Sequence, residues 1–258
     1  MKYKMKYLIV AIPFLCMASG NAQTKTGIDV WLTNPDKSAL FAHGDKQLQF
    51  ETTQNNYPVI NVDNKQTYQY VVSFGFALTG GRAMHIINMS SESRAKLLHE
   101  VFATQGDDIG VSYLRLSIGA SDLNEHVFSY DDLVDEETDT AMKKFELGPD
   151  RKDVIPVLKE IFAINPSIKI LGSPWSPPTW MKTNHDTRGG RLLPEYYAAY
   201  AKYFVKYIQQ MKAAGIAIDA ITVQNEPLHP GNNPSLLLTA PEEKDFIKNK
   251  QKNNAIPT

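Results

Sequence analysis

Several patterns that would commit a protein to a particular chemistry are missing from this sequence. Its 258 residues include one cysteine, Cys16, so a disulfide framework is excluded. The histidines show neither HxH nor HExxH spacing, and the glycine-rich stretch 75–82 lacks the Gly-Lys-Ser/Thr ending of a phosphate loop. We therefore predict no metal site and no cofactor. Lysines and arginines form no basic stripe, which argues against a nucleic acid partner and favours an uncharged one.

The N-terminal residues have the composition of a secretory signal peptide. Three lysines lie among the first six residues, and the apolar run Leu8–Ala18 precedes a small-x-small cleavage site, Gly20–Ala22. That run is too short to cross a bilayer. We expect residues 1–22 to be removed and the mature chain to be periplasmic or secreted, without a stable membrane anchor. The alternative is a lipoprotein anchored through Cys16, but such signals require a small residue where this chain has Leu15.

The rest of the chain has the composition of an ordinary folded protein, with 43% hydrophobic and 21% charged residues. Residues 23–66 contain short alternating pieces, such as Ile28–Leu32 and Leu48–Phe50, separated by turn residues, which predicts short antiparallel strands. Over residues 67–258, strand and helix patterns alternate. This alternation is typical of an α/β fold in which helices cover a parallel sheet.

Four strand–helix units can be recognised in the second part. Strands are predicted over 70–78, 111–118, 168–171 and 220–223. The first is followed by a turn at Gly80-Gly81 and a helix capped by Ser90 or Ser91. Further helices are predicted over 151–163, 194–215 and from 241 onward. Tyrosines 196, 200, 203 and 207 recur at helical spacing, which favours packing against the sheet over a sugar-stacking surface.

Polar side chains follow the ends of these strands, where a parallel α/β fold gathers its reacting groups. They are Arg115, Asp122, Trp175, Asn225 and Glu226. An aromatic face suits the apolar side of a sugar ring, an amide suits its hydroxyls, and a carboxylic acid can protonate a glycosidic oxygen. Hydrolysis of a glycoside needs such an acid and a second, opposed carboxylate. Glu226 suits the role of the acid.

Each of these residues also has a structural interpretation. Trp175 could be a core residue, and Arg115 could form a buried ion pair with Asp122. Asp122 and Glu125 could be solvated loop charges, and the Asn-Glu-Pro string around Glu226 could be an ordinary turn.

Five segments decide between these interpretations by their order. They are SFGFALTGG (73–81), LRLSIGASD (114–122), LGSPWSPPTWMKTN (171–184), LLPEYYAAYAKYFVKYI (192–208) and ITVQNEP (221–227). Together they resemble glycoside hydrolase family 30, which includes glucosylceramidases and bacterial and fungal β-1,6-glucanases. The resemblance covers roughly residues 68–249. It implies a (β/α)8 TIM barrel with a side β-domain, to which residues 23–66 would contribute strands, and retaining hydrolysis of β-glycosides.

The resemblance also implies roles for the strand-end residues. Glu226 matches the acid/base, and Asn225 matches the amide that contacts the sugar 2-hydroxyl and the nucleophile. Trp175 matches the aromatic lining of the sugar subsite, and Arg115 and Asp122 match polar residues on its floor and wall. The expected substrate is a β-glucan or β-glucoside. We place β-1,6-glucan ahead of glucosylceramide because the sequence shows no apolar surface for a lipid.

One part of the family pattern has no counterpart. The family nucleophile is a second Glu near the seventh strand, whereas this chain ends 32 residues after Glu226. Asp122 and Glu125 are the only nearby acids that could substitute, and neither matches the nucleophile. We expect the first four βα units of a barrel, with unpaired edges, instability and no activity. A frameshift or premature stop would explain this, or a second chain could supply the other half. The alternative function is an inactive or carbohydrate-binding remnant.

Overall fold

The computed structural model describes residues 27–49, 52, 54, 56–134 and 137–248. The chain divides into two units, Met1–Tyr68 and Gln69–Thr258. The predicted signal peptide, including Cys16, lies outside the described residues. Among the residues that are described, no helix combines the length and the apolarity that crossing a membrane requires.

The first unit contains two antiparallel strand pairs, as predicted. Strand β1 (Gly27–Ile28) pairs with β4 (Leu48–Gln49), and β2 (Trp31–Leu32) pairs with β3 (Ala42–His43). The rings of Trp31 and His43 lie across the second pair with centroids 4.8 Å apart. Membership of a side β-domain stays a prediction for these strands.

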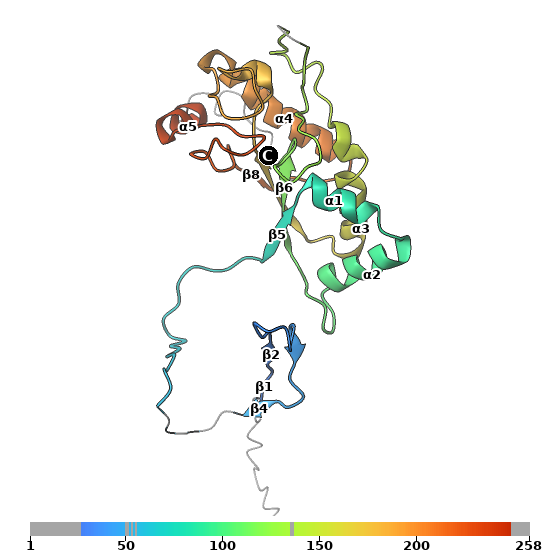
Figure 1. Ribbon diagram of the computed structural model, residues 1–258, viewed down its shortest axis with the longest axis vertical. Helices are drawn as coiled ribbons and strands as arrows, with labels where there is room; N and C mark the ends of the chain where they lie inside the picture. The colour runs from blue at the N-terminus through green and yellow to red at the C-terminus, as the bar shows by residue number, and fades with distance from the viewer. Residues whose placement is uncertain (1–26, 50–51, 53, 55, 135–136, 249–258) are drawn as a thin grey trace, which may run out of the picture. The chain divides into compact units, whose positions relative to one another are not determined.

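The second unit is built on a parallel sheet of four strands in the order β5-β6-β7-β8 (Figure 1). These are β5 (Gly75–Leu78), β6 (Tyr113–Ile118), β7 (Lys169–Pro174) and β8 (Ala220–Ile221). The register places Ala77, Arg115, Leu171 and Ala220 in one row across the sheet. This order confirms the predicted α/β fold with four parallel strands.

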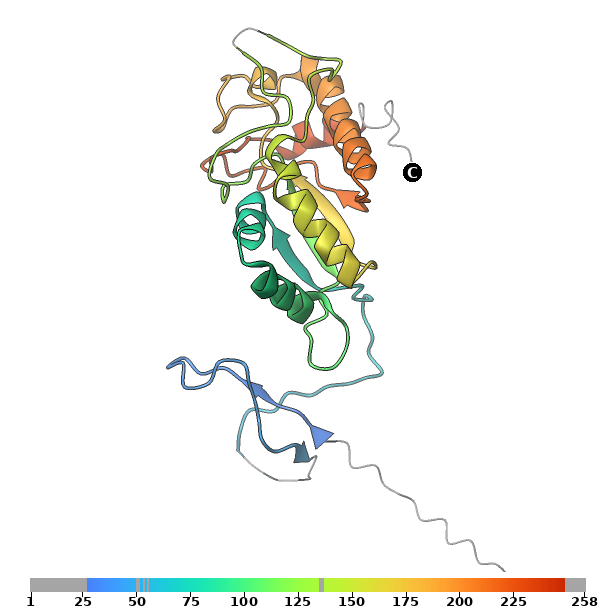
Figure 2. The ribbon, with the colours of Figure 1, turned by 90° about the vertical axis from the view of Figure 1, so that its right-hand side faces the viewer.

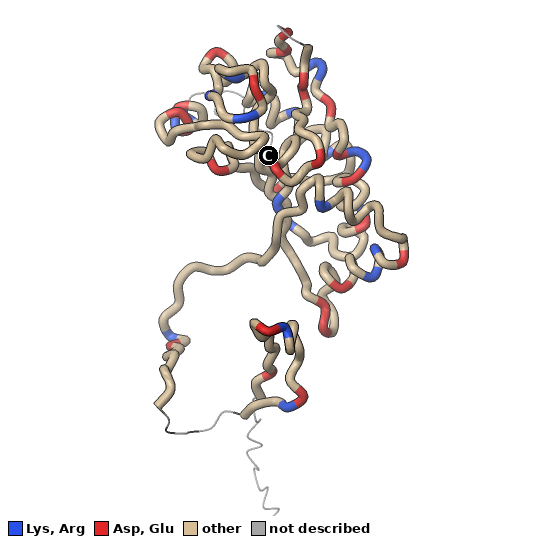
Figure 3. The backbone as a smooth tube through the Cα atoms, viewed as in Figure 1, with Lys and Arg blue, Asp and Glu red and all other residues tan. Residues whose placement is uncertain are grey.

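Among the described residues, five α-helices accompany the sheet. They are α1 (Gly80–Ile87), α2 (Ser91–Phe102), α3 (Val154–Ile164), α4 (Tyr197–Ala213) and α5 (Ala240–Phe246). Short 3₁₀ turns occupy Gly148–Arg151, Thr179–Met181 and Pro194–Tyr196. Helices α1 and α2 both pack against α3, and Figure 2 shows α3 in front of the strands. Charged residues of both signs are interspersed along this unit (Figure 3).

Successive side chains of β6 point to opposite faces of the sheet, and only one of these faces packs in the hydrophobic core. Leu114, Leu116 and Ile118 are buried in one hydrophobic cluster with residues of the helices, whereas Arg115 points to the opposite face of the sheet. β6 thus contributes three residues to the core and places the Arg115 guanidinium on the other face of the sheet.

The tyrosines of α4 pack as predicted. Tyr200, Tyr203 and Tyr207 are fully buried, and the rings of Tyr203 and Tyr207 both stack on Tyr130 with centroids 5.9 Å apart. Tyr196 lies just before the helix and meets the Trp180 ring edge-on. Tyr200, Tyr203 and Tyr207 are therefore core residues and offer no face to a sugar, whereas Tyr196 is half-buried.

The structure corrects the predicted turn at Gly80-Gly81, where α1 begins. Both glycines have ordinary backbone angles, but a Cβ at Gly81 would lie 2.0 Å from the carbonyl oxygen of Leu123, and one at Gly80 would meet the side chain of Asn124. Close approach of the loop after β6 requires these glycines, and no left-handed turn does. The cap of α2 is Ser90, whose hydroxyl accepts from the Ser93 amide at 3.2 Å.

Candidate active site

The parallel strands bring the five predicted site residues to one end of the sheet. Arg115 lies within β6, Trp175 directly follows β7, and Asn225 and Glu226 follow β8. Asp122 lies in the loop after β6. Their side chains form a continuous series of contacts in the order Asp122, Trp175, Arg115, Asn225 and Glu226. The structure therefore joins all five, although they come from three separate regions of the sequence.

Arg115 is at the centre of this series. Its Nη2 donates to Asn225 Oδ1 at 2.5 Å and to Ser173 Oγ at 2.8 Å. Ser173 Oγ in turn shares a hydrogen bond of 2.6 Å with Thr222 Oγ1. Burial lowers the pKa of the Arg115 guanidinium from its ordinary value, and the negative charges of Glu226 and Asp122 act against that shift. A guanidinium remains charged under such conditions, so Arg115 is a fixed cation facing two carboxylates.

The contact with Arg115 fixes the orientation of the Asn225 amide. A guanidinium only donates, so the amide oxygen must face it and the amide nitrogen must face away. Asn225 Nδ2 accordingly lies 3.4 Å from Glu226 Oε2, and the backbone N–H of Asn225 is held by Pro174 O at 2.8 Å. The arrangement directs the Asn225 amide donors toward the Glu226 carboxylate.

Glu226 has a strained backbone and an exposed side chain. Its φ is +44°, in the left-handed region that a side chain with a Cβ disfavours. Such strain persists only where neighbouring contacts impose it, and it is concentrated at functional sites. Asn232 Nδ2 donates to Glu226 Oε2 at 2.7 Å, a contact that the sequence motifs did not indicate. The carboxylate is thus flanked by two asparagine amides.

Trp175 is held at its edge and covered on one face. Its Nε1 donates to Asp122 Oδ1 at 3.0 Å, and the Arg115 guanidinium carbon lies 4.7 Å from the ring centroid, within cation–π range. The side chain is only 6% exposed. Trp175 therefore links the carboxylate of Asp122 to Arg115, and little of its ring is left open to stack on a ligand.

The alternative ion pair between Arg115 and Asp122 does not form within the part of the chain that the structure describes. Asp122 binds the indole of Trp175 instead. Glu125 is exposed, and its Oε1 lies 3.8 Å from His126 Nε2, so it takes no part in the contact series around Arg115. Over the described residues, His, Cys, Asp and Glu form no group of three or more suited to a metal.

Comparison with known proteins places the fold and site in context. Residues 71–254 match the glycosyl hydrolase family 30 TIM-barrel domain. The chain belongs to this family. Among curated proteins, the endo-1,6-β-D-glucanase of Neurospora crassa is 37% identical over 187 residues, which cover 70% of this chain and 38% of that protein. The lysosomal acid glucosylceramidase of Mus musculus is 29% identical over 200 residues, covering 73% of this chain and 38% of that protein.

Two solved structures superpose on most of this chain. An endo-β-1,6-glucanase superposes with a TM-score of 0.73 at 34% identity, covering 88% of this chain and 50% of that one. SrfJ from Salmonella typhimurium superposes with a TM-score of 0.76 at 26% identity, covering 89% of this chain and 51% of the other. The chain therefore spans about half the length of the solved structures that it matches, and less of the curated relatives.

Proposed function

We propose that the protein is an exported hydrolase of β-glycosidic bonds, that its substrate is a β-1,6-glucan, and that Glu226 is the acid/base. The observation that carries the proposal is the contact series that ends at the exposed Glu226 carboxylate, in which a charged arginine orients the amide beside it. The similarity to endo-1,6-β-glucanases supports this substrate over glucosylceramide, since those relatives have the higher identity.

The chemistry assigns each side chain a separate task. Glu226 in its acid form would donate a proton to the departing glycosidic oxygen, and its carboxylate would later take a proton from the attacking water. Asn225 would donate from Nδ2 to a sugar hydroxyl, because its oxygen is engaged by Arg115. Arg115 and Trp175 would hold this donor in place.

A retaining mechanism also requires a second carboxylate roughly 5 to 5.5 Å from the first. We assign that role to no described residue, because Asp122 is bound to Trp175 and Glu125 lies beside His126. This observation favours a second candidate function, a protein that binds a β-glucan without cleaving it.

Two measurements on the purified chain separate these functions. Release of reducing sugar from a β-1,6-glucan would be followed for wild type and Glu226→Gln, and binding of β-1,6-gluco-oligosaccharides would be followed by calorimetry. Turnover that Glu226→Gln removes supports the hydrolase. Binding without turnover, lost in Asn225→Ala, supports the second candidate. A chain that neither binds nor cleaves the glucan contradicts both.

A further inference from the structure

Glu226 is followed by a closed loop that the strand-end motifs did not single out. The Glu226 loop, residues 227–238, begins and ends at the same place, because the backbone N–H of Leu238 donates to Pro227 O at 2.8 Å. Within it, Asn232 donates to Glu226 Oε2 at 2.7 Å. The position of the Asn232 amide, and with it one contact of the carboxylate, therefore depends on where this loop is held.

Lys182 ties the Glu226 loop to the segment after β7. Its side chain is fully buried, and Nζ donates to Ser235 O at 2.8 Å, Ser176 Oγ at 3.0 Å and Thr187 O at 3.1 Å. The three acceptors come from three separate stretches of chain. Further bonds join the same segments: Ser235 N to Thr187 O, Gly189 N to Ser235 Oγ, and Leu237 N to Gly190 O.

The chemistry of Lys182 makes this attachment specific. All three acceptors are uncharged oxygens, and burial lowers the pKa of the ammonium to about 8. A buried ammonium is costly unless each of its three protons is bonded, so the acceptors must be kept in place together. The loop is thereby held in one position.

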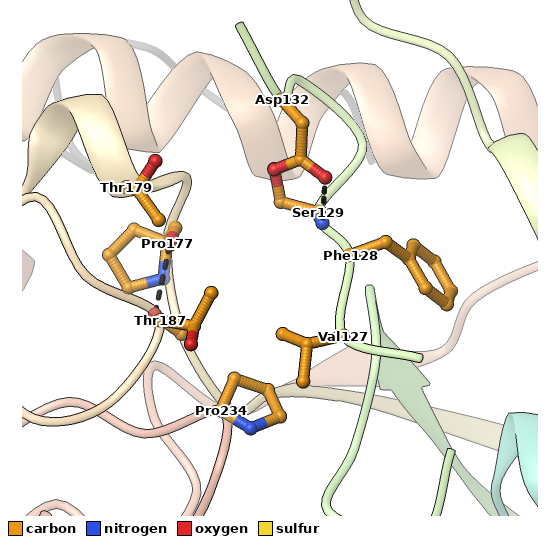
Figure 4. Close-up of a pocket in the computed structure, with 9 residues that line it drawn as sticks. Val127, Phe128, Ser129, Asp132, Pro177, Thr179, Thr187 and Pro234 are labelled. Carbon is orange, nitrogen blue, oxygen red and sulfur yellow. Dashed lines mark hydrogen bonds between the residues drawn. The ribbon is translucent and has the colours of Figure 1, made fainter. Parts of the chain in front are cut away.

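Part of the Glu226 loop borders a cavity, and part of it packs in the core. A cavity of about 200 Å³ is lined by Pro234 of this loop, by Thr187, and by Val127 and Phe128 of the segment after β6 (Figure 4). Leu236 and Leu238 of the loop are buried in the hydrophobic core, so the loop is held by this packing together with its hydrogen bonds to Lys182 and residues 187–190.

We propose that Asn232 is a positioning residue for Glu226 and that Lys182 fixes the loop from which Asn232 acts. The proposal rests on the proposed role of Glu226. Asn232 directs the carboxylate through Oε2, the oxygen that Asn225 Nδ2 also faces, and Lys182 acts only through the Glu226 loop.

The first test uses the full chain labelled with ¹⁵N and requires no turnover, so it decides the proposal even if the hydrolase function fails. The Glu226→Gln substitution should shift the side-chain amide resonances of Asn232, because the carboxylate they contact is replaced. In a Lys182→Met background that shift should disappear. If Lys182→Met does not fold, Lys182→Gln, which keeps two donors, should reduce it. An Asn232 amide insensitive to Glu226→Gln, or a shift unchanged by both Lys182 variants, overturns the proposal.

The second test applies to the active chain. Asn232→Ala should lower kcat about tenfold with KM unchanged, the effect expected of one hydrogen bond to a charged group. Asn232→Gln should restore part of the loss. The matched control is His229→Ala, which removes an exposed side chain from the same loop. Equal kcat values in Asn232→Ala and His229→Ala contradict the positioning role.

Discussion

The buried carboxyl group of Asp150 predicts how the free energy of unfolding depends on pH. Asp150 is 2% exposed and accepts a hydrogen bond from the hydroxyl of Tyr130. Burial raises the pKa of Asp150 to about 8, against the smaller opposing effect of that hydrogen bond. Its ordinary value is 3.8, so between these limits the folded protein retains a proton that the unfolded chain releases.

The sign and size of the effect follow from this difference. The stabilising contribution of the protonated carboxyl is fully present below the ordinary pKa and is lost as pH rises toward the folded value. Each pH unit should lower the free energy of unfolding by about 1.4 kcal/mol on account of this group. Between pH 5 and pH 7, wild type should therefore lose roughly 3 kcal/mol relative to Asp150→Asn, which cannot titrate.

The assay is urea denaturation of both proteins at pH 5, 6 and 7. Comparing them removes the contributions of all other titrating groups, together with any cost of the substitution that is independent of pH. Tyr130→Phe is the matched control, because it removes the hydrogen bond but leaves the carboxyl buried, so it should keep the wild-type slope. Parallel curves for wild type and Asp150→Asn would refute the reasoning.

Three further predictions concern single contacts. Ser90→Ala should cost about 1 kcal/mol of unfolding free energy by removing the cap of α2, whereas Ser91→Ala should not, as denaturation will show. Tyr203→Phe should cost about 1 to 3 kcal/mol, because it leaves the buried N–H of Tyr130 without its acceptor. Tyr200→Phe, which removes a buried hydroxyl with no hydrogen-bond partner in the described part of the chain, should cost less in the same assay. Arg115→Lys should weaken gluco-oligosaccharide binding about tenfold in calorimetry, because a lysine cannot reproduce the planar contacts that orient Asn225, whereas the exposed Arg188→Lys should leave binding unchanged.

Much of the second unit could be predicted because its strands and helices differ clearly in hydrophobic period. The four parallel strands, the packing role of Tyr200, Tyr203 and Tyr207, and the family were all evident from the sequence. Boundaries were less accurate. The first strand begins at Gly75, where its register with Tyr113 begins, rather than at residue 70. Apolar composition alone does not show where a neighbouring strand starts.

The candidate residues could be named from strand ends, but their connections could not. Arg115 and Asn225 are 110 positions apart, and only the folded sheet shows that one orients the other. Lys182 and Asn232 were missed for the same reason. A lysine in the sequence is usually a surface charge, and an asparagine in a Pro-rich loop is usually a turn residue. Their significance depends on burial and on contacts across the chain.

The role of Glu226 as acid/base can be tested most directly by varying the leaving group. Wild type and Glu226→Gln would be compared on a nitrophenyl β-glucoside and on a β-1,6-gluco-oligosaccharide. Only the oligosaccharide needs its leaving oxygen protonated, so loss of an acid catalyst should slow its cleavage roughly 10²- to 10⁴-fold and affect the nitrophenyl glucoside much less. Equal losses on both substrates, or no loss on the oligosaccharide, would contradict the assignment.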